Sequence, residues 1–184
     1  MKQTLFLVIA LLSLTTVCFG QNKQFKKGQI DAQLGIGFIN TLSVGLSQAG
    51  VSSAIKSSFA FPPPMISVDY GVTNEVSFGG YLSYASANFT SFGSLIENDK
   101  IFFIGARGLY HVDLHSKLDT YGGLGLAYGS FTATEPNNSM KSTSGKLYYQ
   151  LLVGSRYKVT PNTGAFLELG YGITVINIGL NVTF

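Results

Sequence analysis

Strict alternation of apolar and polar residues marks both ends of this chain as β-strands. Near the C-terminus the apolar positions of the alternation are Ile178, Leu180, Val182 and Phe184. Near the N-terminus, about residues 28–39 alternate over five consecutive apolar positions. A period of two is that of a strand with one apolar and one polar face. A terminal strand so regular, with no lysine or proline to blunt its edge, is protected from aggregation if it pairs with the first strand and closes a barrel.

The same alternation recurs between these two strands and predicts a meander. Six further strands are expected at about residues 62–72, 76–84, 102–113, 123–128, 147–157 and 165–171. Short connections are expected at residues 73–75, 115–119, 160–162 and 172–175, and longer loops at residues 40–61, 85–99 and 133–145. Short turns alternating with longer loops are typical of outer-membrane barrels, whose turns face the periplasm and whose loops face outward.

Composition and charge placement indicate that the apolar parity faces lipid. The chain of 184 residues has 46% hydrophobic but only 11% charged residues, whereas soluble domains average about 25% charged residues. Charges within the expected strand cores all lie on the opposite parity: Asp31, Asp69, Arg107, Asp113, Arg156 and Glu168. An Arg or Lys facing lipid at the midplane costs roughly 2–4 kcal/mol. The sequence therefore predicts an all-β, eight-stranded antiparallel up-and-down transmembrane β-barrel with a polar lumen.

Aromatic residues of the apolar parity fall near both ends of the expected strands. Near the periplasmic ends lie Tyr70, Phe78, Tyr110, Tyr157 and Phe184. Near the external ends lie Phe38, Tyr84, Phe102, Tyr128, Tyr149 and Tyr171. Aromatic side chains concentrate where hydrocarbon meets water. We expect these residues to form two girdles at the membrane interfaces.

The first 20 residues have the pattern of a cleavable secretory signal peptide. Lys2 precedes an apolar run over residues 5–14, and small residues occupy the −3 and −1 positions of a cleavage site after Gly20. We therefore expect a signal peptide over residues 1–20 and a single barrel domain over residues 21–184, exported through the secretory pathway.

The cysteine count and the net charge exclude several classes of function. Cys18, the only cysteine, would leave with the signal peptide, so no disulfide or thiolate metal site is expected. A lipoprotein anchored through Cys18 is the alternative, and the bulky Val17 before it argues against this. The net charge of +3 gives no basis for binding nucleic acid. We expect no cofactor and no metal.

Three stretches resemble a known family. They are Gly-Ala-Arg-Gly-Leu-Tyr-His at residues 105–111, Phe-Leu-Glu-Leu-Gly-Tyr-Gly at residues 166–172, and the terminal strand ending at Phe184. Together they look like the outer-membrane protein β-barrel domain of the porin family, which includes small barrels similar to outer-membrane protein X and the membrane domain of outer-membrane protein A. The resemblance implies a multi-pass protein of the Gram-negative outer membrane, in contact with lipids and lipopolysaccharide. It also implies that the barrel-assembly machinery recognises the terminal strand.

The inward charges are the candidate site. We expect a lumen charge network made of Asp31, Asp69, Arg107, His111, Arg156 and Glu168. Arg156 and Glu168 share the inward parity on neighbouring strands, across a turn near Asn162, and are expected to pair directly. Because an eight-stranded barrel is just filled by side chains, the network is expected to neutralise and plug the lumen. The alternative is a gate that opens a narrow pore.

Three functions remain open at this stage. The first is a non-enzymatic surface protein that serves envelope integrity or adhesion through its loops, with an unknown loop ligand. The second is a small porin or transporter that passes small or hydrophobic solutes through the barrel or sideways out of it. The third is a lipid-modifying enzyme. His111 and His115 are the only histidines, and neither has a lipid-facing serine partner in the predicted strands, which argues against the enzyme.

Overall fold

The computed structural model describes residues 24–40, 55–59, 63–91, 94–115, 117–134 and 141–184. The expected signal peptide at residues 1–20 lies outside the described residues, as does most of the expected loop at 40–61. Within the described ranges, no helix is long and apolar enough to cross a membrane.

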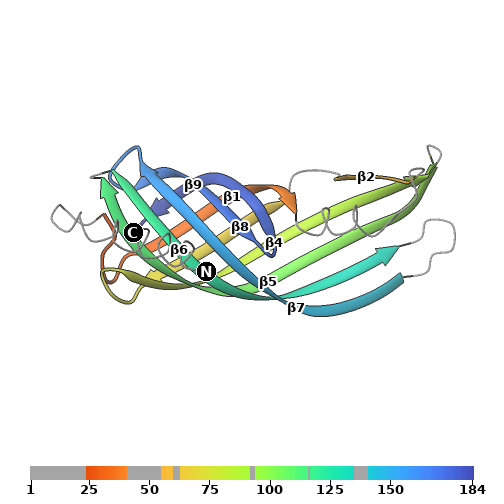
Figure 1. Cartoon of the computed structure of the whole chain (residues 1–184), viewed down its shortest axis with the longest axis horizontal. Helices are drawn as coiled ribbons and strands as arrows, with labels where there is room; N and C mark the ends of the chain where they lie inside the picture. Colours follow the sequence, from red (N-terminus) through yellow and green to blue (C-terminus); the bar gives the residue numbers. More distant parts are fainter. Residues whose placement is uncertain (1–23, 41–54, 60–62, 92–93, 116, 135–140) are drawn as a thin grey trace, which may run out of the picture.

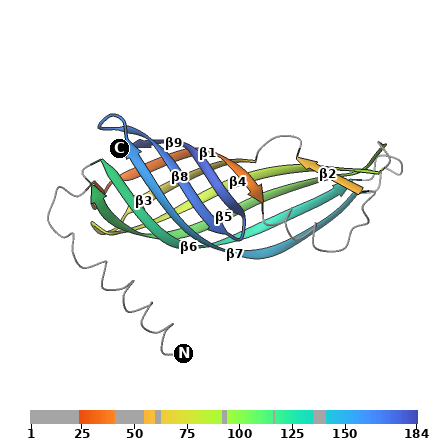
Figure 2. The same ribbon diagram turned by 45° about the horizontal axis from the view of Figure 1, so that its top comes forward.

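The described residues form nine strands of one antiparallel sheet. In chain order they are β1 (Ile30–Asn40), β2 (Ile55–Phe59), β3 (Pro64–Gly71), β4 (Val76–Ser91), β5 (Ser94–His115), β6 (Leu118–Thr134), β7 (Lys141–Lys158), β8 (Thr163–Tyr171) and β9 (Thr174–Thr183). All but β2 form a closed ring, which Figures 1 and 2 show as a tilted cylinder with β2 beyond one end of it.

The cylinder is closed by pairing of the first and last strands. β1 pairs with β3 on one side and with β9 on the other, and the β4–β5 pairing completes the ring. At the seam, Ile30 and Phe184 exchange two backbone hydrogen bonds, with N···O distances of 3.1 and 2.8 Å. The prediction of an eight-stranded antiparallel barrel is confirmed. Closure satisfies the backbone donors and acceptors that an open edge would leave free.

The two faces of the barrel wall differ as the alternation predicts. The side chains of Leu34 and Leu180 point outward and are 59% and 66% exposed. Asp31 and Asp69, on the inward parity, are fully buried in the lumen. The wall is therefore apolar outside and polar inside, the arrangement required by hydrocarbon around the barrel.

Four strands continue past the rest of the barrel. β4, β5, β6 and β7 contain 16 to 22 residues, whereas β3 and β8 contain 8 and 9. Their far ends project as a curved sheet, on the right in Figure 1, which we call the extension. β2 lies along one edge of the extension and pairs with the end of β4, with Ile55 opposite Ser91. We call this end of the barrel the loop end, and the end with the short connections the turn end.

The extension corrects the sequence-based loop assignments. Residues 85–99 were expected as a loop, but β4 runs to Ser91 and β5 begins at Ser94 in a tight hairpin. In the expected loop at 133–145, β6 runs to Thr134 and β7 begins at Lys141, and β2 lies within the expected loop at 40–61. These segments are rich in Ser, Thr and Asn and lack an apolar parity. The strands of the extension are therefore held by ladder pairing without the usual hydrophobic pattern.

A charge placed halfway up the lipid-facing wall should impair folding. Val153 is 59% exposed and lies four residues from both Tyr149 and Tyr157 on the same face of β7. Val153→Arg is expected to lower the stability of the folded barrel by roughly 2–4 kcal/mol. The matched control is Thr143→Arg, on the same strand and face but in the extension. Heat-modifiable gel mobility and urea titration in lipid vesicles measure both; equal losses for the two variants would contradict the assigned facing.

Candidate functional site

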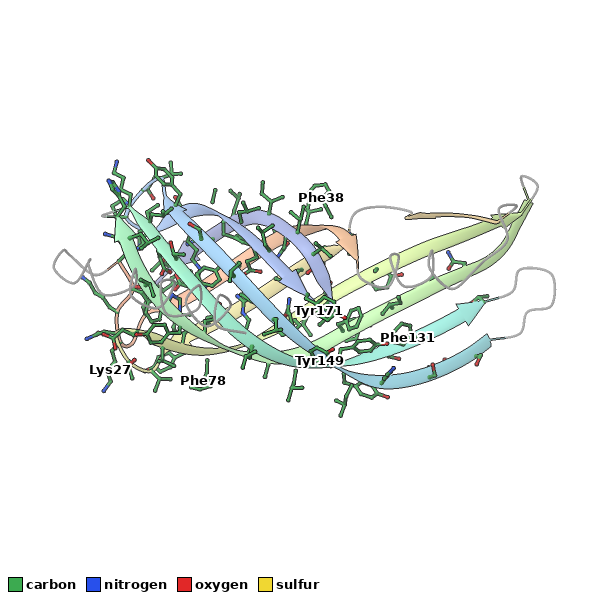
Figure 3. All side chains as sticks on the ribbon, viewed as in Figure 1. Lys27, Phe38, Phe78, Phe131, Tyr149 and Tyr171 are labelled. Atoms are coloured by element: carbon green, nitrogen blue, oxygen red, sulfur yellow. The ribbon has the colours of Figure 1, made fainter. Side chains whose placement is uncertain are left out.

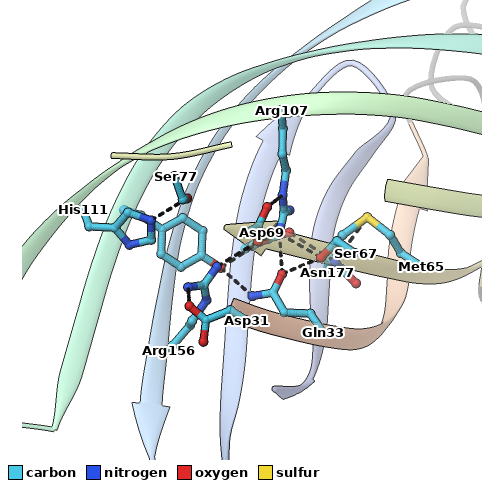
Figure 4. A network of polar contacts seen from close by, with 12 residues as sticks. Asp31, Gln33, Met65, Ser67, Asp69, Ser77, Arg107, His111, Arg156 and Asn177 are labelled. Carbon is cyan, nitrogen blue, oxygen red and sulfur yellow. Dashed lines mark hydrogen bonds and ion pairs between the residues drawn. The ribbon is translucent and has the colours of Figure 1, made fainter. Parts of the chain in front are cut away.

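Inward side chains fill the lumen in stacked layers. Nearest the turn end is a group that we call the His111 cluster: Phe25, Ser77, His111, Asp119 and Tyr121. Above it is the polar network: Asp31, Gln33, Ser67, Asp69, Arg107, Arg156, Glu168 and Asn177 (Figure 4). Above that is the apolar layer: Met65, Tyr81, Ala85, Ile101, Phe103, Ala127 and Ile173. The lumen is thus polar towards the turn end and apolar towards the loop end.

Arg107 joins two buried carboxylates across the barrel. Its Nε and Nη2 donate to the two oxygens of Asp69 at 2.9 and 2.6 Å, and its Nη1 donates to Glu168 Oε1 at 3.0 Å. Nη2 also donates to Gln33 Oε1 at 2.5 Å and Ser67 Oγ at 2.8 Å. The fork-shaped contact with Asp69 is the strong bidentate form of an arginine–carboxylate pair. β1, β3, β5 and β8 are therefore tied together by one side chain.

Arg156 makes the second centre of the polar network. Its Nη1 donates to Asp31 Oδ2 at 2.9 Å and to Asp119 Oδ2 at 3.3 Å, and its Nη2 donates to Asp69 Oδ2 at 3.1 Å. Its guanidinium lies 4.5 Å from the ring centroid of Tyr121, a cation–π contact. Asp69 serves both arginines, so the two halves of the network share one carboxylate.

Neutral donors complete the shells of the remaining carboxylates. Glu168 accepts hydrogen bonds from the Tyr121 hydroxyl at 2.8 Å and from Asn177 Nδ2 at 3.2 Å. Asp31 accepts from Gln29 Nε2 at 2.8 Å and from Thr183 Oγ1 at 2.5 Å. Buried charges persist where they are paired and hydrogen-bonded. The four carboxylates that the structure describes in the lumen are thus served by two arginines, and hydroxyl and amide donors, together with His111, supply the remaining hydrogen bonds.

The expected direct pair between Arg156 and Glu168 is wrong. The register of β7 and β8 places Gly154 opposite Glu168 and Phe166 opposite Arg156. The cation of Glu168 is instead Arg107, which comes from the far side of the barrel. Cross-strand parity alone cannot identify such partners, because long side chains in a narrow lumen contact across the axis as well as between neighbouring strands.

The structure also adds members that the sequence interpretation missed. Asp119 was placed in a turn, yet it is 2% exposed and contacts both Arg156 and His111. Its parity is that of Tyr121, so extending the alternation of that strand backwards would have identified both as lumen residues. Gln33, Ser67 and Asn177 share the inward parity, but they carry no charge and were not expected in the network. Asp113, expected on the inward parity, has no described side chain.

His111 is held between a serine and an aspartate. Its Nε2 lies 2.9 Å from Ser77 Oγ, and its Nδ1 lies 3.0 Å from Asp119 Oδ1. These are the pairwise contacts of a Ser–His–Asp triad, and the sequence interpretation did not foresee this lumen-facing serine. Phe25 covers one face of the imidazole, and both Ser77 and Phe25 are fully buried. His115, in contrast, is exposed near the β5–β6 turn, away from this cluster.

The aromatic residues assigned to the girdles lie on the outer wall. Ten of the eleven are exposed, and Tyr84 is half-buried. In Figure 3, Phe38, Tyr149 and Tyr171 lie where the barrel meets the extension, and Phe78 lies near the opposite end. Tyr149 and Tyr171 contact each other, with ring centroids 6.1 Å apart. The placement fits two interfacial belts, which remain a prediction.

Aromatic side chains close the lumen at the base of the extension. Phe103 packs edge-on against Tyr148, with ring centroids 5.4 Å apart and an interplanar angle of 88°. Phe131 packs against both of these residues. Edge-to-face packing of this kind is favourable beyond the area it buries. The polar network is therefore capped by apolar side chains towards the loop end.

The extension has one covered edge and one open edge. β2 covers the β4 edge, but the β7–β8 ladder stops at Leu151 opposite Tyr171. The N–H of Lys158 donates to Lys117 on the β6 side, so alternation along β7 turns the backbone groups of Thr143, Gly145 and Leu147 to the opposite side. Among the described residues, no strand pairs with that side.

Two further observations concern small ligands. A groove of about 320 Å³ lies in the lipid-facing wall, lined by Ile66, Val68, Leu82 and Ile104 around Gly80. The lining is almost entirely apolar and suits a hydrocarbon chain. For metals, the described residues contain no group of three or more His, Cys, Asp or Glu side chains that could hold an ion.

Removing the carboxylate shared by both arginines should destabilise the barrel strongly. Asp69→Ala leaves Arg107 and Arg156 buried with fewer partners, and it is expected to lower the free energy of unfolding by roughly 3–5 kcal/mol. The control is Glu75→Ala, which removes a half-buried carboxylate from the β3–β4 turn. Urea titration of both variants in lipid vesicles tests this. An unchanged midpoint for Asp69→Ala would mean that water solvates the arginines in the lumen.

Comparison with solved structures identifies the fold. Outer-membrane protein OprG from Pseudomonas aeruginosa is similar with a TM-score of 0.62 at 12% identity, over 89% of this chain and 99% of that chain. Neisserial surface protein A has a TM-score of 0.56 at 18% identity, over 85% and 96%. Ail, the attachment invasion locus protein of Yersinia pestis, has a TM-score of 0.52 at 12% identity, over 86% and 99%. No family model and no curated protein matches the sequence. The chain thus has the fold of the small outer-membrane β-barrels.

Proposed function

We propose that this chain, which has the small outer-membrane barrel fold, is a non-enzymatic surface protein of a Gram-negative outer membrane. Its lumen is closed, and its extension serves adhesion or envelope integrity. The observation that carries the proposal is that one molecule combines a filled lumen with a sheet that projects beyond the barrel. Function usually resides on elements held by a rigid scaffold, and here the scaffold ends in a structured platform.

The packing of the lumen supports a closed barrel. Arg107, Arg156 and their partners occupy the half towards the turn end, and Phe103 with its aromatic neighbours occupies the other half. Eight strands enclose a space that side chains just fill. Passage of a solute would require several buried ion pairs and the apolar layer to move together.

The extension supports a role in surface contacts. Among the residues that the structure describes, no strand pairs with the β7 edge at Thr143, Gly145 and Leu147, and the Leu147 side chain is 71% exposed. An exposed strand edge is a template for an added strand from a partner. Ail is named for attachment and invasion, and the neisserial relative is named a surface protein; this chain shares their fold. The geometry of the β7 edge thus supports the proposal of an adhesive surface there.

The proposal extends to the orientation and the partners of the barrel. In this proposal the turn end faces the periplasm, the girdle residues contact lipid and lipopolysaccharide, and residues 1–20 are the export signal. The terminal strand pairs with β1 and ends in the exposed Phe184. We infer that the barrel-assembly machinery recognises this strand during insertion.

A transport function is the second candidate, favoured by the groove in the lipid-facing wall. Ile66, Leu82 and Ile104 line it, and the glycines Gly80 and Gly105 make the wall thin at this point. A hydrophobic solute could leave sideways here.

The lipid-modifying enzyme ranks third, because Ser77 and His111 lie inside the lumen, whereas lipid substrates lie outside.

Conductance measurements separate the closed scaffold from the transporter. The folded protein in a planar bilayer is expected to show no discrete openings, because the polar network and the apolar layer fill the lumen. Glu168→Gln and the turn variant Glu75→Gln should be equally silent. Discrete openings that change with Glu168→Gln but not with Glu75→Gln would make the network a gate and transport the leading function.

Blocking the open edge should weaken adhesion. Thr143→Pro removes an edge N–H without removing a ladder bond to β6, whereas Thr143→Ala removes only the side chain. Cells producing Thr143→Pro are expected to be retained on a matrix-coated surface about fivefold less than cells producing Thr143→Ala, as expected for the loss of about 1 kcal/mol of hydrogen bonding. Equal retention, at equal surface levels of folded protein, would contradict a role for the β7 edge.

A further inference from the structure

The chain preceding β1 folds back into the mouth of the barrel at the turn end. Gln29 N donates to Lys26 O at 3.2 Å, and Gly28, the third residue of this turn, has a φ of 84°. An i to i+3 hydrogen bond with positive φ at the third position is the type II geometry that glycine favours. The turn reverses the chain, so Phe25 enters the lumen and is fully buried.

Phe25 stacks on an imidazole ring whose orientation is fixed by hydrogen bonds. Its ring lies parallel to the His111 imidazole, with centroids 3.7 Å apart and an interplanar angle of 2°. Ser77 and Asp119 hold the two nitrogens of that imidazole, so the ring cannot turn away freely. The contacts around His111 therefore have a physical role without catalysis: they fix the flat seat on which Phe25 rests.

Two side chains from separate turns anchor the backbone of the same segment. Lys158 Nζ donates to Gln24 O at 2.8 Å, and Asn74 Oδ1 accepts from Lys27 N at 3.0 Å. Gly71 leaves the room that the segment needs. A Cβ at Gly71 would lie 2.5 Å from Lys26 O and 2.9 Å from Phe25 Cζ.

None of these contacts belongs to the strand ladder, which begins at Ile30 opposite Tyr70. Gly28 ties the chain to the end of β3 just before the ladder, because its N–H donates to Gly71 O at 2.8 Å. We propose that residues 24–27 form a stopper that closes the turn-end mouth over the His111 cluster and swings out about Gly28 while the barrel stays closed. Withdrawal exposes Ser77, His111 and Asp119 to water from that end only, because the apolar layer still closes the other end. The proposal does not depend on the adhesive role of the extension.

Accessibility of a single thiol tests the stopper. Ser77→Cys in a Cys18→Ser background places the only cysteine of the chain beside His111, on whose ring Phe25 is stacked. The folded full chain is treated with a small, charged methanethiosulfonate, with heat-modifiable mobility confirming that each variant has folded. The thiol is expected to react slowly when Phe25 is present. Phe25→Ala should speed its reaction by about tenfold or more, as for a locally opened segment.

Matched variants distinguish the stopper from general loosening. Lys27→Ala changes an exposed side chain of the same segment and should leave the rate unchanged, and Lys117→Cys in place of Ser77→Cys should react rapidly in every background. Gly71→Ala keeps Phe25 but crowds the segment out, so it should speed the reaction as Phe25→Ala does. Gly80→Ala is its control, because a Cβ there meets only Gly105 O at 3.6 Å.

Two results would overturn the proposal. One is a rapid reaction of the Ser77→Cys thiol while Phe25 and Gly71 are intact, because the mouth would then be open in the resting protein. The other is continued protection in folded Phe25→Ala and Gly71→Ala variants, because some other element would then close the mouth. Should Phe25→Ala fail to fold, Gly71→Ala alone decides between these outcomes.

Discussion

Closure of the sheet is the constraint on which the rest of this structure depends. Once β1 pairs with β9, each of the eight barrel strands pairs with a strand on both sides, as hydrocarbon demands. Closure with only eight strands also sets a narrow bore. Side chains on the inward parity are therefore crowded together and buried. The polar network, with Asp69 shared between two arginines, is the consequence of that crowding.

The sequence predicts the barrel well because lipid enforces a simple rule on the wall. Outward residues such as Leu34 and Leu180 must be apolar, whereas the inward residues that alternate with them need not be. The wall strands therefore show a period of two in the sequence. Where the alternation lapses, the prediction failed: past the expected strand ends, β4 to β7 continue through Ser, Thr and Asn as strands. Those segments carry no apolar parity from which the sequence could predict a strand.

The candidate site was only partly predictable, for a different reason. Parity identifies which residues point inward, and the six expected lumen residues do lie there. It does not identify partners, because Arg107 reaches Glu168 across the bore whereas Arg156 turns towards Asp31 and Asp119. The buried position of Phe25 could not be predicted from parity. Phe25 lies outside the alternating segments, and its position depends on a turn at Gly28 and on stacking against His111 from β5.

The shared carboxylate also bears on how the barrel comes to have a unique register. Arg156 meets Asp31 and Asp69, which lie 125 and 87 residues away in the chain, so these contacts arise only when distant strands have come together. A slip of one residue turns the whole inward set of a strand towards lipid. In each strand that carries a charged inward residue, such as Asp31, Asp69 or Arg156, this would place the charge outside and leave its partner alone inside. The ion pairs can therefore form only after distant strands have paired, and they stabilise only one alignment. The lumen side chains thus help to select the strand register, before the folded barrel meets any surface partner.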